Sequence, residues 1–280
     1  MPTTSADLYS QITLSPLNLE EVAAILVVAL PLAAILGFWL GRFQRRRLRD
    51  EAEAVEKILG DATMNTFLAL LGLLLAFAFG NSLSVAQATK DAITNEAAAL
   101  GTAFLRADYL AEPGRTELQG ALLDYARTRM LPRDHAIRNA AEAHAFLERT
   151  LAAQARLWPL TLAATADPTP APIQAFVAGA MNEALDAHLY RMATVSVPIA
   201  AFTQIVLLVG SVIAVLLLGN RTGILGHALT WRTFAFASFL IMIMYMVVDI
   251  RRGSEGLIRV DDSLLAATIF DMEQSLAARK

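Results

Sequence analysis

The sequence predicts an all-α membrane protein with four transmembrane helices and a helical insert between the second and third spans. Apolar residues make up 56% of the 280 residues and charged residues only 18%, whereas soluble domains average roughly 45–50% and 25%. Four long runs contain no Lys, Arg, Asp or Glu. The residues between the second and third runs are rich in Ala, Leu, Glu and Arg, which favour helices.

The composition argues against several function classes. Lys and Arg number 23 against 26 Asp and Glu, a net charge of −3, so no global basic field attracts nucleic acid and none is expected as a partner. Cysteine is absent, which removes disulfides and thiolate nucleophiles. No HExxH, GxSxG or P-loop motif occurs. We therefore expect no enzyme, no catalytic residue, no bound metal and no cofactor.

The first uncharged run is the first predicted span, residues 22–41. It follows Glu20 and Glu21 and ends before Arg42, and its length suffices to cross a hydrocarbon core of roughly 30 Å. No Lys or Arg precedes it and a basic cluster follows it, so the run is expected to be a retained anchor and not a cleaved signal peptide.

The second predicted span, residues 62–89, is only partly apolar. Its strongly apolar part, residues 67–80, is short and gives way to Asn81 and Ser84. A helix this polar at one end is expected to face other helices or water there. No proline occurs between Thr66 and Leu110, so we expect the helix to continue unbroken into the insert.

The insert and the last two spans complete the chain. Trp231, Arg232 and Arg251 flank the fourth span and can anchor it at the membrane interface. Within the insert, turns or helix starts are expected at Pro113-Gly114, Pro132, Trp158-Pro159 and the Pro168, Pro170, Pro172 cluster. The predicted order is an N-terminal tail (1–21), span one (22–41), a basic connector (42–61), span two (62–89), the insert (90–191), span three (192–220), a short connector (221–232), span four (233–249) and a C-terminal tail (250–280).

Orientation follows from the basic residues beside the spans. The connector after the first span contains six of them and the tail before it none; they are Arg42, Arg45, Arg46, Arg47, Arg49 and Lys57. The first connector is therefore expected in the cytoplasm, with the insert and both termini outside it. Arg251, Arg252 and Arg259 act against this orientation.

Residues 70–130, with LGLLLAFAFGNSL, NEAAALGTAFLRADYL and LLDYARTRM, resemble the bacterial bestrophin-like domain family, whose function is largely unassigned. The string DIRRGSEGLIRV, residues 249–260, resembles that family's ending, in which a basic turn leads into an extended piece. The resemblance implies a multi-pass protein of the bacterial inner membrane. Bestrophins themselves are pentameric anion channels with four spans. They keep the middle region and both termini in the cytosol, opposite to the orientation that the basic connector predicts.

Two faces of the second span are candidates for function. Gly72, Ala76 and Gly80 recur every four residues, a small-xxx-small pattern that lets membrane helices pack closely. A second stripe lies about 120° away, given a helical rotation of 100° per residue. It comprises Leu70, Leu74, Phe77, Asn81, Ser84 and Ala88.

The second stripe has two interpretations. If several copies surround an axis, it lines a pore in which Phe77 forms a hydrophobic constriction and Asn81 and Ser84 a polar vestibule. Otherwise it packs within one subunit, with the polar side chains hydrogen-bonding between helices. Further along, Arg106 could attract anions to a pore mouth, or pair with Glu96, Asp108 or a neighbouring subunit.

These features yield two functional hypotheses. The first is a homo-oligomeric, anion-favouring channel lined by the second span, whose partners are membrane lipids, small inorganic ions and further copies of the chain. The alternative is a non-conducting envelope protein whose extracytoplasmic helical bundle senses or binds a partner. A secondary transporter is disfavoured, because no ionisable residue lies centrally in a predicted span.

Overall fold

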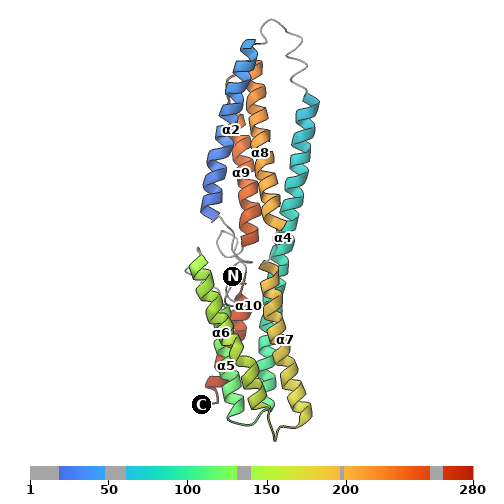
Figure 1. Cartoon of the computed structure of the whole chain (residues 1–280), viewed down its shortest axis with the longest axis vertical. Coiled ribbons are helices and arrows are strands. Elements are labelled where there is room, and N and C mark those ends of the chain that lie inside the picture. The colour runs from blue at the N-terminus through green and yellow to red at the C-terminus, as the bar shows by residue number, and fades with distance from the viewer. Residues whose placement is uncertain (1–18, 48–60, 131–139, 196–198, 253–260, 280) are drawn as a thin grey trace, which may run out of the picture. The chain divides into compact units, whose positions relative to one another are not determined.

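The computed structural model describes residues 19–47, 61–130, 140–195, 199–252 and 261–279, and all regular elements in these residues are helical. The predicted all-α class is confirmed for this part of the chain. The elements labelled in Figure 1 and the short η1 are α2 (Leu19–Arg47), α4 (Asp61–Arg106), η1 (Ala107–Tyr109), α5 (Gly114–Arg129), α6 (Ala140–Ala164), α7 (Ala171–Val195), α8 (Ile199–Leu225), α9 (Trp231–Arg252) and α10 (Ser263–Ala277).

Four of these helices are long and apolar enough to cross a membrane: α2, α4, α8 and α9. The described residues thus contain four membrane-length helices, which is the number of spans that the sequence predicts. Most of the N-terminal tail, most of the basic connector and the extended piece expected within residues 249–260 lie outside the described residues.

The helices form two compact units. The membrane unit contains α2, α8, α9 and α4 up to Ser84, and the bundle unit contains α4 from Val85 together with η1, α5, α6, α7 and α10. Helix α4 belongs to both, as expected from its lack of proline. The unbroken helix is therefore confirmed over 46 residues.

In the membrane unit, α2 and α8 cross with almost no space between their backbones. A Cβ built on Gly37 would overlap the Leu216 carbonyl oxygen, and one built on Gly219 would overlap that of Ala34. Gly41 and Gly223 are equally constrained. These glycines form a small-xxx-small pair that brings two membrane helices together. Sequence analysis did not single out this pair, although its GxxxG spacing is visible on both helices.

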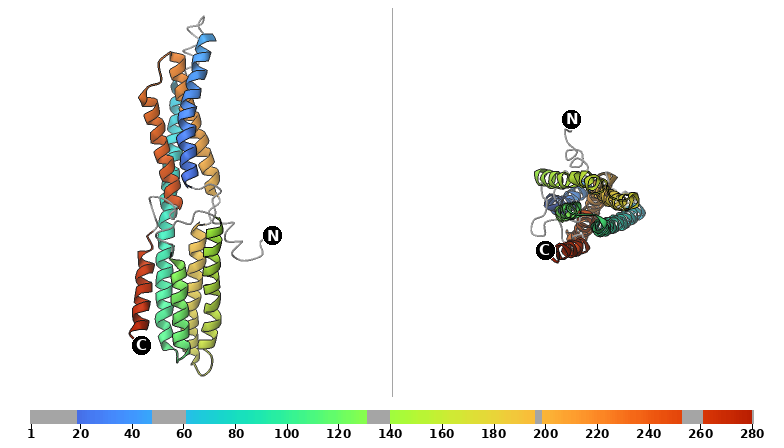
Figure 2. Two further views of the ribbon diagram at one scale, coloured as in Figure 1. Left: turned by 90° about the vertical axis from the view of Figure 1, so that its left-hand side faces the viewer. Right: turned by 90° about the horizontal axis from the view of Figure 1, so that it is seen from below.

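In the bundle unit, α5, α6 and α7 run side by side with the end of α4 (Figure 2). Their shared core includes Leu100, Leu118, Leu122, Tyr125, Leu157 and Met181. Helix α5 starts beside Pro113 as expected, but the turn or helix start expected at Trp158-Pro159 is wrong. Pro159 lies inside α6, where the tertiary context overrides the local preference against proline in a helix.

Helix α10 gives the C-terminal tail a structural role that was not predicted. Leu265, Ile269 and Met272 are buried in the core of the bundle unit. The Arg127 guanidinium donates to Glu273 at 2.7 Å, and Arg279 pairs with Asp108 at 2.7 Å. The i, i+4, i+7 spacing of the three apolar residues is typical of an amphipathic helix and could have revealed α10.

Candidate functional site

The predicted pore stripe lies on the outward face of α4. All six of its residues, Leu70 to Ala88 as named above, are exposed, and Phe77 retains 67% of its surface. Leu71, Leu75 and Ala78 each follow a stripe residue, about 100° around the helix, and enter the core of the membrane unit. Packing of the stripe against the helices of its own chain is therefore not seen in the described residues.

The predicted small-residue face of α4 is open as well. A Cβ added to Gly72 or Gly80 would meet nothing within 4 Å. Gly72 and Ala76 line an apolar groove of about 460 Å3 between α4 and α9, with Phe79 and Phe236 in its walls. Within one chain these residues do not bring helices together, so their packing role stays a prediction about contacts between chains.

Arg106, the predicted anion-attracting residue, is engaged by α7. Its Nη1 donates to the Phe176 carbonyl oxygen at 3.1 Å, and its guanidinium lies 4.3 Å from the centre of the Phe176 ring. Cation–π stacking of this kind stabilises a contact by about 0.5–1 kcal/mol at exposed sites. The contact gives Arg106 a structural role in joining α4 to α7.

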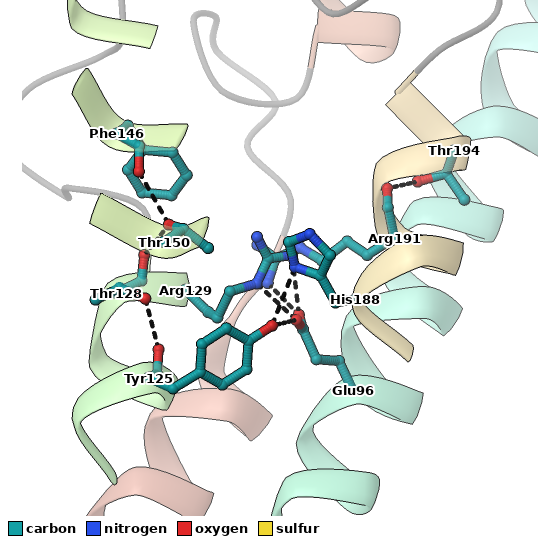
Figure 3. Close-up of polar contacts among 9 residues, drawn as sticks. All are labelled: Glu96, Tyr125, Thr128, Arg129, Phe146, Thr150, His188, Arg191 and Thr194. Carbon is teal, nitrogen blue, oxygen red and sulfur yellow. Dashed lines mark hydrogen bonds and ion pairs between the residues drawn. The ribbon is translucent and has the colours of Figure 1, made fainter. Parts of the chain in front are cut away.

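A buried cluster of five polar side chains lies in the bundle unit (Figure 3). Glu96 of α4 is fully buried. Its Oε1 accepts from Arg129 Nε at 2.6 Å, and its Oε2 accepts from Arg191 Nη1 at 2.6 Å. Arg129 comes from α5 and Arg191 from α7, so one carboxylate joins three helices.

Tyr125 and His188 complete the cluster. The Tyr125 hydroxyl lies 3.0 Å from His188 Nδ1 and donates to Glu96 Oε1 at 3.4 Å. This geometry lets the hydroxyl oxygen accept a hydrogen bond from Nδ1–H while its O–H donates one to the carboxylate.

The charges of the cluster do not sum to zero, because two guanidinium groups face one carboxylate. Burial, together with the neighbouring Arg129, lowers the pKa of His188 to about 4, so the imidazole is neutral near pH 7. Burial also lowers the pKa of Arg191, with repulsion from Arg129 adding to it. Burial raises the pKa of Tyr125. The buried cluster therefore carries a formal charge of +1.

This arrangement is suited to holding helices in register. Breaking a buried ion pair leaves an uncompensated charge and is strongly destabilising. Among the described residues, no three His, Cys, Asp or Glu side chains gather as metal ligands. The expectation that the chain is not an enzyme remains a prediction.

Sequence reasoning missed the Glu96 cluster because its members are far apart in the chain. Glu96 and Arg191 are 95 residues apart, and no local spacing links them. Comparison with protein-family models, curated proteins and solved structures finds no match to this chain.

Proposed function

We propose that the chain forms a homo-oligomeric ion channel in which the stripe on α4 faces a shared pore. The observation that supports this most is the exposure of all six stripe residues on a helix whose adjacent face is packed into the membrane unit. Along the helix the exposed side chains change from leucine and phenylalanine to asparagine and serine. A dry constriction followed by a polar vestibule has this order.

Lipid is a poor environment for the polar end of the stripe. Asn81 and Ser84 are exposed, and polar groups next to lipid are costly unless they have partners. Water in a pore, or the same residues in neighbouring copies, would supply hydrogen bonds. Membership of the bestrophin-like family and a bacterial inner-membrane location are parts of the same proposal.

Anion selectivity receives no support from Arg106, because the Phe176 carbonyl oxygen and ring engage its guanidinium. The proposal therefore concerns conduction of small inorganic ions without assigning their charge.

A second candidate function is supported by exposed apolar side chains on the bundle unit. Leu189 and Tyr190, neighbouring residues of α7, are both exposed, and Tyr190 retains 70% of its surface. Exposed apolar patches mark surfaces that bind partners. A non-conducting envelope protein that binds another protein through this surface is the alternative.

Electrical recording tests the proposal directly. Purified full-length protein is reconstituted into planar bilayers in KCl, after chromatography has established its oligomeric state. We expect discrete current steps from the oligomer and none from lipid alone. A folded oligomer without current would overturn the channel and leave the partner-binding protein as the better account.

A further inference from the structure

The exposed stripe of α4 continues beyond the membrane unit. Counting on from Ala88 in alternating steps of three and four residues reaches Asp91, Asn95, Ala98, Thr102, Leu105 and Tyr109. Five of these six are exposed and Thr102 is half-buried. On the other side of the helix, Ala97, Leu100 and Phe104 lie in the core. We call the exposed row from Ala88 to Tyr109 the seam.

The spacing of the seam is that of a coiled coil. Steps of three and four residues average 3.5, the period at which one face of a helix stays against a partner helix in a left-handed supercoil. In a surface helix without a partner helix, nothing constrains the exposed residues to this period. Asn95 occupies a core-type position of the heptad, where asparagine specifies register by bonding to the same residue of the partner.

Large apolar side chains end the seam. Leu105 retains 64% of its surface and Tyr109 65%, although both lie beyond the uncharged run of α4. Beside them, α4 and α10 enclose a groove of about 400 Å3 lined by Ala98, Leu105 and Met272 among others. The same face therefore offers protruding side chains and a hollow, which is the complementarity that helix packing requires.

We propose that further copies of this chain pack on the seam, so that the α4 helices run parallel and in register outside the membrane. This inference rests on the proposed homo-oligomer and extends its contacts to the bundle unit. In a closed ring the equivalent residues of all copies lie at the same level around the axis. The Asp91 carboxylates then gather around the axis, where Gln87 Nε2 orients each one through a hydrogen bond of 2.9 Å.

Gathering Asp91 has a consequence for assembly. Like charges around one axis repel, and the repulsion is largest at low ionic strength. Assembly through the seam is therefore opposed by Asp91 and favoured by cations held between the carboxylates. The variant Asp91→Asn removes the repulsion without changing the size of the side chain.

The natural absence of cysteine makes disulfide cross-linking the test. Single variants Ala98→Cys and Leu105→Cys in the full-length protein are oxidised in native membranes and analysed on non-reducing gels. Asp186→Cys on α7 and Ala155→Cys on α6 are the controls, because both positions are exposed but lie off the seam. A disulfide requires Cβ atoms about 3.5–4.5 Å apart, so we expect dimers from the seam variants at several times the yield of the controls.

Adding Asp91→Asn to Leu105→Cys should raise the yield further at low salt and leave it unchanged at high salt. Equal cross-linking on and off the seam would overturn the inference, as would a product with a protein of different mass. Bilayer recordings distinguish this failure from failure of the proposed channel. Currents without seam cross-links would overturn only the packing of copies on the seam. Seam cross-links without currents would overturn only the channel.

Discussion

The carboxylate of Glu96 on α4 accepts a hydrogen bond of 2.6 Å from Arg191 on α7, and both side chains are buried. Arg129 on α5 binds the other oxygen of the same carboxylate at the same distance. One acidic side chain thus compensates two arginines from two other helices. Among the described residues, this carboxylate is the negative charge that both buried guanidinium groups contact.

Replacing Glu96 by Gln is expected to destabilise the bundle unit by about 3–5 kcal/mol, because two buried guanidinium groups lose their counter-charge. The measurement is denaturant unfolding of the full-length protein in detergent, followed by far-UV circular dichroism. Glu273→Gln is the matched control, since Glu273 pairs with Arg127 at the exposed surface. Exposed pairs contribute roughly 0–1 kcal/mol, so equal losses in the two variants would contradict the interpretation.

Acid should destabilise the fold through His188. Its pKa is about 4 in the folded chain, against an ordinary value of 6.5, so the unfolded chain binds more protons between these values. Stability is then greatest above pH 6.5 and falls as the pH drops towards 4, by an amount on the order of 3 kcal/mol. Thermal midpoints of the wild type and of His188→Gln, compared across this window, measure the effect. If the thermal midpoint of His188→Gln fell as steeply with decreasing pH as that of the wild type, the pH dependence would arise from other groups.

The crossing of α2 and α8 should tolerate no side chain at its glycines. Gly219→Ala places a Cβ against the Ala34 carbonyl oxygen, and we expect a loss of about 1–3 kcal/mol as the helices separate. Gly179→Ala in α7 is the control, because nothing lies within 4 Å of its Cβ position. The two thermal midpoints in detergent give the comparison, and similar values would show that the crossing is looser than described.

Phe77 is expected to limit conduction. Phe77→Ala widens the dry constriction and admits water, so conductance or open probability should rise, whereas Asn81→Leu extends the dry segment and should lower it. Phe79→Ala is the aromatic control, since Phe79 lines the groove against α9 and not the stripe. Single-channel recording measures all three, and a rise in Phe79→Ala alone would place the conduction path elsewhere.

Cysteine labelling tests the orientation. We expect Asp186→Cys in the insert to react with a membrane-impermeant maleimide in intact cells, and His227→Cys in the short connector to react only after permeabilisation. Both positions are exposed, so burial does not limit either reaction. The reverse pattern would place the insert in the cytosol, as in bestrophins.

Features that depend on neighbouring residues in the chain could be predicted from the sequence, whereas contacts between residues far apart in the chain could not. The four membrane-length helices follow from runs of uncharged residues, and the continuity of α4 follows from the absence of proline. The sequence alone does not decide between anion attraction and structural pairing for Arg106, because its partner Phe176 is 70 residues away. The exposure of Phe77 could not be predicted either, because a helical wheel shows which residues share a face of the helix but not which residues cover that face.

The close crossing of α2 and α8 also constrains how the protein is made. Gly37 leaves the ribosome about 180 residues before Gly219, an interval of roughly 10–35 s at ~5–20 residues per second. Throughout this time the glycine face of the first span has no α8 to pack against. The first span therefore enters the bilayer as a helix whose closest contact forms only after α4, α5, α6 and α7 have been made, and a chain truncated before α8 would retain those helices while leaving that face bare.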